Sequence, residues 1–244
     1  MTPQADHTRL AGEEGRVLLV DKPLNWTSFD VVRRVRFALD VKKVGHAGTL
    51  DPRATGLLIV CTGKETKSFD RYAGLEKEYT GTFRLGIQTP SFDLETAVTE
   101  NRDSAGVSLD QLLEVVNQFR GKQLQIPPMY SAVKHKGRPL YDIARKGKTV
   151  EREPKEVEVS EFEILAFITP DVDFRIVCSK GTYIRSLVHD VGIRLGCGAV
   201  LTALRRTRIG TFSVRDAITV EQLDDLHIEA RSERQPGDDN SIPT

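Results

Sequence analysis

Two long segments of strand-like composition follow each other in the second half of the chain, and they constrain the fold most. They are residues 155–168 (KEVEVSEFEILAFI) and 171–180 (DVDFRIVCSK), separated only by a Thr-Pro pair. Parallel strands need a crossover of a dozen or more residues, so strands joined by such a short turn pair in antiparallel fashion. The chain is therefore expected to contain one long antiparallel hairpin.

Helix-like and strand-like segments alternate along the rest of the chain. Further strands are expected at residues 16–23, 57–61 and 77–86, with a strand pair within 199–214. Helices are expected at residues 27–40, 64–73, 108–121, 139–147 and 182–196. This order and the antiparallel hairpin predict an α+β fold with a mixed, mainly antiparallel central sheet flanked by helices.

Two of the expected helices carry capping signals. Thr27 or Ser28 can cap the first helix, and Ser108 stands in capping-box spacing with Gln111. Gly121 follows the end of the helix that Ser108 begins. The residues expected on the core face of the first helix are Phe29, Val32, Val35 and Leu39.

Length and composition indicate a globular protein with one main domain. The chain has 244 residues, 39% of them hydrophobic, and we expect one domain over 16–226 between disordered polar tails, 1–15 and 227–244. No run of about 18 apolar residues and no secretory signal is present, so a cytoplasmic location is expected. Three cysteines, odd in number and set in apolar surroundings, are expected to be buried and free: Cys61, Cys178 and Cys197.

Charge is balanced overall but unevenly distributed. The chain has 35 basic and 35 acidic residues, yet residues 175–215 contain eight Lys or Arg and one acid, Asp190. A second basic stretch covers 134–148 and a third covers 33–43, whereas the acids gather elsewhere. Segregation of this kind can make one face attractive to phosphate groups, although solvated helix faces would give a similar count.

The segment GHAGTLDPRATGLL, residues 45–58, holds a single carboxylate in a shaped loop. Pro52 keeps Asp51 out of the helical region, and Gly45, Gly48 and Gly56 allow backbone conformations and close approaches that a Cβ forbids. The apolar run after the loop anchors it to the core, which is how a catalytic side chain is held on a rigid support. An ordinary Asp-Pro turn would also fit these residues.

A series of segments in this chain resembles the TruB family of tRNA pseudouridine synthases. The segments are DKPLNWTS, KVGHAGTLDPRATGLL, KEY, IPPMYSAVKHKGRPLYDIAR, CSKGTYIRSL and LRRTRIGTF, in this order between about Leu18 and Val214. The resemblance implies a pseudouridine synthase catalytic fold with an RNA-gripping insertion. It also implies an isomerase that converts the T-loop uridine at tRNA position 55 to pseudouridine, without metal or organic cofactor.

The resemblance assigns three catalytic residues. Asp51 matches the aspartate of the family's G-x-L-D-P-x-A-T-G-x-L motif, and Arg185 is expected to pair with it and keep it ionised. Tyr79 matches the tyrosine that stacks on the target base and can take part in the later proton removal. Asp51 would act either as a nucleophile or as a base that gives a glycal-like intermediate, and the residues leave both routes open.

Other residues take supporting and binding roles by the same resemblance. His46 matches the histidine that fills the space of the extruded bases, and Leu204 the apolar partner of the base. Lys22, with Pro23, is expected beneath the catalytic loop at the substrate site. Tyr130 and Lys134 fall in the RNA-gripping insertion. A cluster of arginines is expected either to contact phosphates or to hold the fold: Arg205, Arg206 and Arg208.

The chain departs from the family pattern in two places. Asn25 stands where the family has glycine, and a left-handed backbone is expected there because asparagine tolerates it. About thirty acidic and polar residues follow Gly210, so the sequence is expected to be a short form lacking the C-terminal PUA domain. The T-arm of tRNA is the expected partner, and a monomer the expected state.

Two other functions fit part of the pattern. An RNA chaperone would need the basic stretches but not Asp51, Tyr79 and Arg185 together. A glycosidase needs two carboxylates flanking the bond, and no second acid accompanies Asp51 in the matched motifs. The segment TGKETK does not indicate a nucleotide-binding protein, because it lacks the G-x-x-x-x-G-K-S/T spacing of a phosphate-binding loop.

Overall fold

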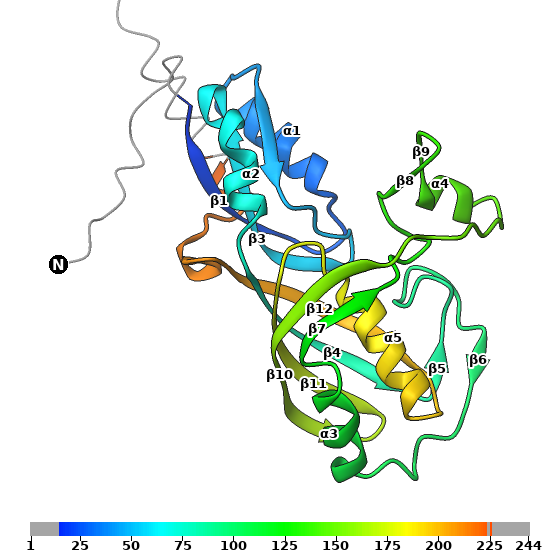
Figure 1. The fold of residues 1–244 in the computed structure, drawn as a ribbon. Helices are drawn as coiled ribbons and strands as arrows, with labels where there is room; N and C mark the ends of the chain where they lie inside the picture. Colours follow the sequence, from blue (N-terminus) through cyan, green and yellow to red (C-terminus); the bar gives the residue numbers. More distant parts are fainter. Residues whose placement is uncertain (1–14, 224, 226–244) are drawn as a thin grey trace, which may run out of the picture.

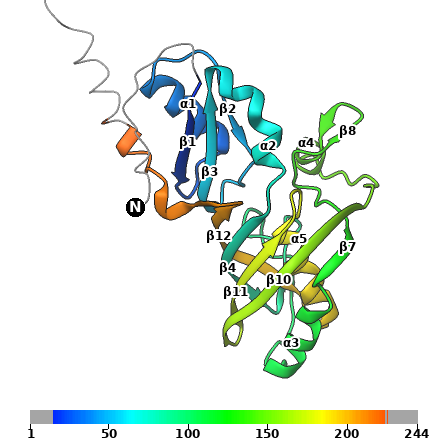
Figure 2. The ribbon, with the colours of Figure 1, turned by 60° about the vertical axis from the view of Figure 1, so that its left-hand side comes forward.

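The computed structural model describes residues 15–223 and residue 225, and it is built around one large sheet. Its strands are β1 (Val17–Lys22), β2 (Val44–Ala47), β3 (Ala54–Thr62), β4 (Lys77–Leu85), β7 (Gly121–Gln125), β10 (Lys155–Ile168), β11 (Asp171–Cys178), β12 (Ala199–Ile209) and β13 (Phe212–Ser213). The strand order is β1-β3-β12-β4-β11-β10-β7, with β2 added to β3 and β13 to β12. Figures 1 and 2 show two lobes: β1, β2 and β3 belong to the N-terminal lobe, and β7, β10 and β11 to the C-terminal lobe.

Helices and short elements complete the chain. The helices are α1 (Ser28–Ala38), α2 (Phe69–Ala73), α3 (Leu109–Asn117), α4 (Leu140–Ala144) and α5 (Ile184–Arg194). The 3₁₀ turns are η1 (Gly63–Ser68) and η2 (Val214–Asp216). Two small hairpins lie outside the main sheet, β5–β6 (Ile87–Gln88 and Glu100–Asn101) and β8–β9 (Lys134–His135 and Arg138–Pro139).

The pairing pattern confirms a mixed, mainly antiparallel sheet. β10 and β11 form the long antiparallel hairpin that the sequence predicts, with two register shifts along it. Among the named strands of the described residues, the parallel pair of this sheet joins β12 to β3, with Leu204 opposite Ala54 and Arg206 opposite Gly56. β12 therefore lies between β3 and β4 and connects the two lobes through one continuous sheet.

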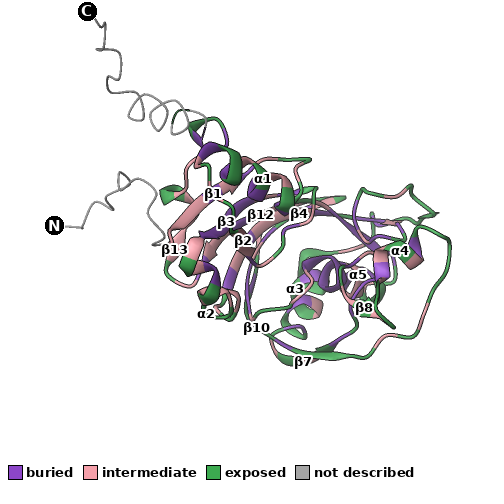
Figure 3. Cartoon of the chain, turned by 90° about the horizontal axis from the view of Figure 1, so that it is seen from above, coloured by how far each residue is buried: buried purple, intermediate pink, exposed green. Residues whose placement is uncertain are grey.

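The core has three main parts around this sheet. Alternate residues of β3 point to opposite faces, so Leu58 and Val60 pack beneath α1, whereas Leu57 and Ile59 pack on the side of α2. Burial on both faces explains why β3 reads as a continuous apolar run. The largest cluster fills the C-terminal lobe between the sheet, α3 and α5. Figure 3 shows these buried stretches along β3 and α5.

The helix starts agree with the capping signals, but one core assignment is wrong. Thr27 forms a capping box with Asp30, and Ser108 forms one with Gln111. Phe29 is 57% exposed and does not face the core. The buried residues of α1 are Ser28, Val31, Val32, Val35 and Ala38. At 100° per residue Phe29 lies beside this stripe, and its ring faces the Arg33 guanidinium instead.

Several short elements differ from the sequence expectation. The helix expected over 64–73 begins as the 3₁₀ turn η1, and only its second half, α2, is α-helical. β2, β7 and the β8–β9 hairpin have two to five residues, too few for a clear alternation. Gly121 does not end α3, which ends with its cap at Gln118; it opens β7 with a φ of 88°. The three cysteines are buried and free, as expected.

A small subassembly extends from the C-terminal lobe. It contains α4 and the β8–β9 hairpin, and Figures 1 and 2 show it standing apart from the main sheet. Met129, Leu140 and Ala144 form its own apolar cluster, with Tyr130 packed against it. The expected tails, 1–15 and 227–244, lie outside the described residues apart from Gly15. In the described part of the chain, no helix is long and apolar enough to cross a membrane.

Candidate active site

The loop between β2 and β3 presents Asp51, and glycine makes its shape possible. Gly48 has a φ of 96° and Gly56 a φ of 104°. A Cβ at Gly56 would lie 2.3 Å from the backbone oxygen of Arg206, so no other residue fits there without movement of β12. Ser28 holds the loop from α1, because its Oγ accepts from the Leu50 amide at 2.9 Å.

Lys22 supports the same loop from behind. It is fully buried, and its Nζ donates to the carbonyl oxygens of Pro23 (3.0 Å), Trp26 (2.6 Å) and Pro52 (3.4 Å). Burial lowers the pKa of Lys22 to about 8. Asn25 has a φ of 64°, which confirms the expected left-handed backbone, and its amide donates to Pro52 at 2.8 Å. The geometry makes Lys22 a support of the loop rather than a contact of the substrate.

Arg206 fixes the loop from β12. Its side chain is buried; Nε donates to Leu57 at 2.7 Å and Nη2 to Gly48 at 2.9 Å. Of the two roles left open by the sequence, a phosphate contact and a structural role, the geometry of this arginine fits the second. Its neighbours also form internal ion pairs, Arg205 with Asp21 at 2.6 Å and Arg208 with Glu76 at 3.1 Å.

Arg185, in the first turn of α5, joins the loop to the C-terminal lobe. Its side chain is 3% exposed, and its Nε lies 2.8 Å from Oδ2 of Asp51. Nη1 donates to the Ser91 carbonyl and Nη2 to the Tyr130 carbonyl, both at 3.0 Å. The guanidinium therefore contacts three separate segments of the chain, which leaves it little freedom to turn.

A second carboxylate, that of Asp93, lies near the Arg185 guanidinium, and the sequence pattern did not identify it as a site residue. Its Oδ2 is 3.6 Å from the Arg185 Nε, and its Oδ1 accepts from the Glu95 amide at 2.9 Å. Asp93 is buried; it lines a small cavity together with Asp51 and Arg185, but it does not line the large cleft that Tyr79 and Leu204 share with Asp51. A glycosidase pair would need both carboxylates at the substrate, so this position does not favour that reaction.

The charge of Asp51 depends on three neighbouring effects. Its side chain is 40% exposed, but protein atoms surround the carboxyl group closely enough to desolvate it. This burial raises the pKa of the Asp51 carboxyl, the positive charge of Arg185 lowers it, and the negative charge of Asp93 raises it again. The net direction is upward, so the arginine offsets only part of the burial.

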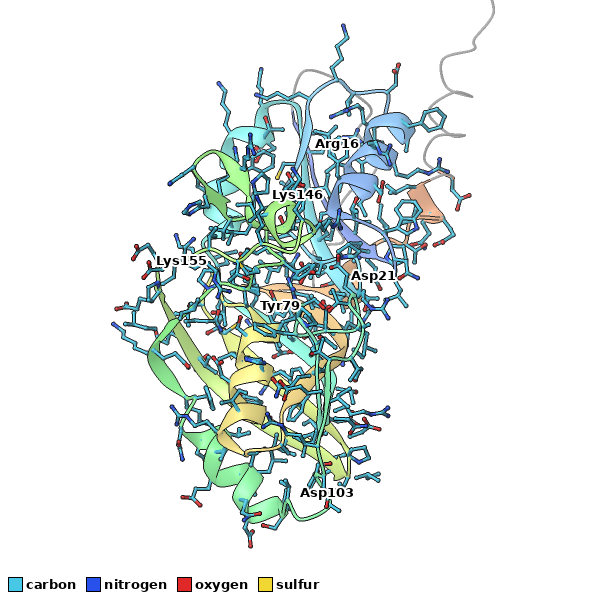
Figure 4. All side chains as sticks on the ribbon, turned by 90° about the vertical axis from the view of Figure 1, so that its right-hand side faces the viewer. Arg16, Asp21, Tyr79, Asp103, Lys146 and Lys155 are labelled. Atoms are coloured by element: carbon cyan, nitrogen blue, oxygen red, sulfur yellow. The ribbon has the colours of Figure 1, made fainter. Side chains whose placement is uncertain are left out.

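A cleft of about 580 Å³ opens above Asp51 and has the size of a small-molecule or nucleotide site. Tyr79 and Leu204 line it together with Asp51 and Arg185. Burial raises the pKa of Tyr79, so its phenol keeps its proton at neutral pH. Figure 4 shows Tyr79 in the middle of the molecule, between Arg16 of the N-terminal lobe and Asp103 of the C-terminal lobe.

The remaining expected residues lie outside this cleft. His46 is on β2 opposite Val60, and burial followed by the charge of Arg206 lowers its pKa. Tyr130 contributes its backbone oxygen to Arg185, and Lys134 is exposed on β8 of the subassembly. The structure thus brings together Asp51, Tyr79, Arg185 and Leu204. In the described part of the chain, no group of three His, Cys, Asp or Glu side chains could hold a metal ion.

Solved structures share this fold. The chain resembles one from a Cbf5-Nop10-Gar1 complex, with a TM-score of 0.70 and 32% identity, over 90% of this chain and 56% of that chain. It also resembles a chain from an H/ACA RNP bound to a substrate RNA containing 2′-deoxyuridine, with a TM-score of 0.68 and 28% identity, over 92% and 56%. The fold is that of a pseudouridine synthase.

Family models define the class more closely. Residues 36–184 match the model of the TruB family pseudouridylate synthase (N terminal domain), and residues 185–238 match the tRNA pseudouridylate synthase B C-terminal domain. The chain belongs to the TruB family. The boundary between the two models falls within α5, so the ion pair of Asp51 and Arg185 joins residues from both.

Curated relatives agree with this assignment. "tRNA pseudouridine synthase B" of Flavobacterium johnsoniae is 48% identical over 214 residues, covering 85% of this chain and 93% of the relative. The protein of the same name from Chloroherpeton thalassium is 50% identical over 215 residues, covering 86% and 89%.

Proposed function

We propose that this chain is a tRNA pseudouridine synthase that isomerises the T-loop uridine at tRNA position 55. The observation that carries the proposal is the Asp51–Arg185 ion pair of 2.8 Å at the base of a cleft of nucleotide size. The names of the relatives support tRNA as the substrate. The order of the matched sequence segments supports the T-loop uridine as the target.

The reaction rearranges one nucleotide without adding or removing atoms. The bond between uracil N1 and ribose C1′ breaks, the detached base turns, and a bond forms between C5 and C1′. The proton on C5 is lost and N1 gains one, so the product is an isomer of the substrate. No oxidant, reductant or water enters the balance.

Asp51 supplies the charged oxygen that this rearrangement requires. Its carboxylate either attacks the nucleoside and is later released, or removes a ribose proton to give a glycal-like intermediate that accepts the base through C5. Arg185 holds the carboxylate in a fixed orientation on both routes. The raised pKa makes the ionised carboxylate a stronger base and nucleophile than an exposed aspartate.

Tyr79 and Leu204 supply the surfaces that hold the detached base. Both line the cleft with Asp51, so a flipped-out uracil would lie between an aromatic ring and an aliphatic side chain. A closed fit is needed because water would trap the detached base as a hydrolysed product. The Tyr79 hydroxyl can take part in the final removal of the C5 proton only as a relay that gives up its own proton as it accepts the one from C5, because its raised pKa keeps it protonated.

The subassembly of α4 and the β8–β9 hairpin is proposed to hold the RNA. Lys134 lies there among six basic residues of the 134–148 stretch, where the family has its insertion. Tyr130 links this unit to the site because its carbonyl holds Arg185. We also propose that the protein is a cytoplasmic monomer and that it needs no metal or organic cofactor.

Tritium release tests this function. A tRNA transcript labelled with tritium at uracil C5 loses the label to water when pseudouridine forms. The protein should release one tritium per tRNA from the T-loop site, and a transcript with cytidine at that site should give no product there. Binding of the tRNA without release would contradict the proposal and favour an RNA chaperone.

A further inference from the structure

A stacked pair of rings, Phe92 and His189, lies next to the aspartate-arginine site and has no role in the reaction described above. The ring centroids are 3.8 Å apart and the planes differ by 15°. Phe92 belongs to the 89–96 segment between β5 and β6, whereas His189 belongs to α5. The stack therefore connects this segment to the helix that carries Arg185.

Arg185 and His189 bind the same segment from successive turns of α5. Residues four apart lie on one face of a helix, so the two side chains point to the same side. Arg185 contacts the Ser91 carbonyl at 3.0 Å and the Asp93 carboxylate at 3.6 Å, on either side of Phe92 in sequence. The ring of His189 contacts Phe92 between them. Three consecutive residues are thus held by one helix face.

The backbone of Phe92 needs this support. Its φ is 64°, a left-handed value that a bulky residue adopts only when its surroundings enforce it. The Leu201 amide donates to the Phe92 carbonyl at 3.0 Å, and the Phe92 amide donates to Thr89 at 3.2 Å. The turn at Phe92 is what aims the Ser91 carbonyl and the Asp93 carboxylate at the same guanidinium.

His189 contributes its flat ring rather than a charge or a hydrogen bond. Its Nδ1 is buried and has no hydrogen-bond partner among the described residues. Burial lowers the pKa of His189, so the imidazole is neutral at physiological pH. Burying a nitrogen without a hydrogen-bond partner costs free energy. The contact that this ring does make is the stack of its face on Phe92.

We infer that Phe92 and His189 form a positioning pair, which holds the 89–96 segment so that Asp93 and Ser91 fix Arg185 against Asp51. This inference deepens the proposed function and rests on it. Neither ring lines the cleft, so the pair acts on the reaction only through Arg185. Loss of the stack should therefore slow the chemical step without weakening tRNA binding.

The test compares His189→Ala with His189→Phe and with Val191→Ala, a buried substitution on the same helix. Single-turnover tritium release should fall at least about tenfold in His189→Ala, since a displacement of about 1 Å can cost about a hundredfold. The Kd for tRNA should stay within about threefold. His189→Phe, which keeps a flat ring, should restore the rate. Val191→Ala should lower the melting temperature but keep the rate.

A double-mutant cycle separates positioning from a general structural effect. If His189 acts through Arg185, the pair Arg185→Lys with His189→Ala should be no more than about threefold slower than Arg185→Lys alone. Independent, multiplying effects would overturn the inference, and so would a His189→Ala rate within threefold of the unaltered protein.

Hydrogen exchange gives a readout that needs no activity. Amides of residues 89–96 should exchange faster in His189→Ala than in Val191→Ala, because only the first releases the segment. Equal exchange in both variants would contradict the inference. Absence of tritium release from the unaltered protein would instead contradict the proposed function, and the exchange experiment would still test the positioning pair.

Discussion

The two lobes hold their halves of the active site in different ways. In the N-terminal lobe, steric contacts and backbone geometry place Asp51: Gly56 lies against β12, and Lys22 and Arg206 bind the carbonyls around the loop. In the C-terminal lobe, side-chain hydrogen bonds and one aromatic stack place Arg185. The first arrangement tolerates almost no change of shape, whereas the second can be altered one polar contact at a time. Substitutions in the N-terminal lobe should therefore mainly lower the free energy of unfolding, whereas substitutions in the C-terminal lobe should mainly lower the reaction rate.

The largest effect is expected at Gly56. Gly56→Ala puts a methyl group 2.3 Å from a backbone oxygen at a φ of 104°, so the fold should lose about 3 kcal/mol of unfolding free energy and the site its shape. Gly106→Ala is the matched control, because nothing lies within 4 Å of its added Cβ. Chemical denaturation measures both. A Gly56→Ala protein as stable as the control would show that the steric description of this lobe is wrong.

Arg185→Lys should give the next largest effect, on the rate rather than on the fold. Lysine keeps the charge but lacks the planar fork that joins Asp51, Ser91 and Tyr130. The single-turnover rate should fall on the order of 100-fold, from misplacement of the carboxylate. Arg84→Lys alters a bidentate pair on the exposed Asp171 and should leave the rate unchanged. Equal rates in the two variants would show that the guanidinium of Arg185 has no role in the mechanism.

Asp93→Asn should produce a smaller effect, visible in the pH profile. The Asp93 charge raises the pKa of Asp51, so its removal lowers that pKa. The reaction requires the ionised carboxylate, so the rate falls when the pH drops through the pKa of Asp51. The acid limb of the single-turnover profile should therefore move to lower pH in Asp93→Asn. Asp173→Asn is the control, because Asp173 is exposed and bonded to Thr82, and it should leave the acid limb in place. A shift of the limb to higher pH in Asp93→Asn would contradict the statement that the Asp93 charge raises the pKa of Asp51.

The contrast between the lobes also explains what could be predicted from the sequence. The shape of the Asp51 loop depends on local sequence: its glycines, its proline and the start of the apolar run after it lie within 14 residues, and Asn25 by itself indicates a left-handed turn. The β10–β11 hairpin was predictable because long strands joined by a short turn have one way to pair. Both features depend on neighbours in the chain.

Asp93 could not be found in the same way, because its contact with Arg185 joins residues 92 positions apart in the chain. Its surroundings, TPSFDLET, look like an ordinary polar loop. Phe29 failed for a related reason: the apolar residues of α1 permit two faces, and only packing against β1 and β3 selects Val31 over it. Contacts that tertiary packing decides leave little trace in a local pattern.

The most direct test of the account compares Asp51→Asn with the unaltered protein in single-turnover tritium release from labelled tRNA. Asparagine keeps the shape of the side chain but cannot act as a nucleophile or a base, so release should stop while the Kd for tRNA stays within about threefold. Release by Asp51→Asn at a rate within tenfold of the unaltered protein would contradict the claim that this carboxylate performs the chemistry.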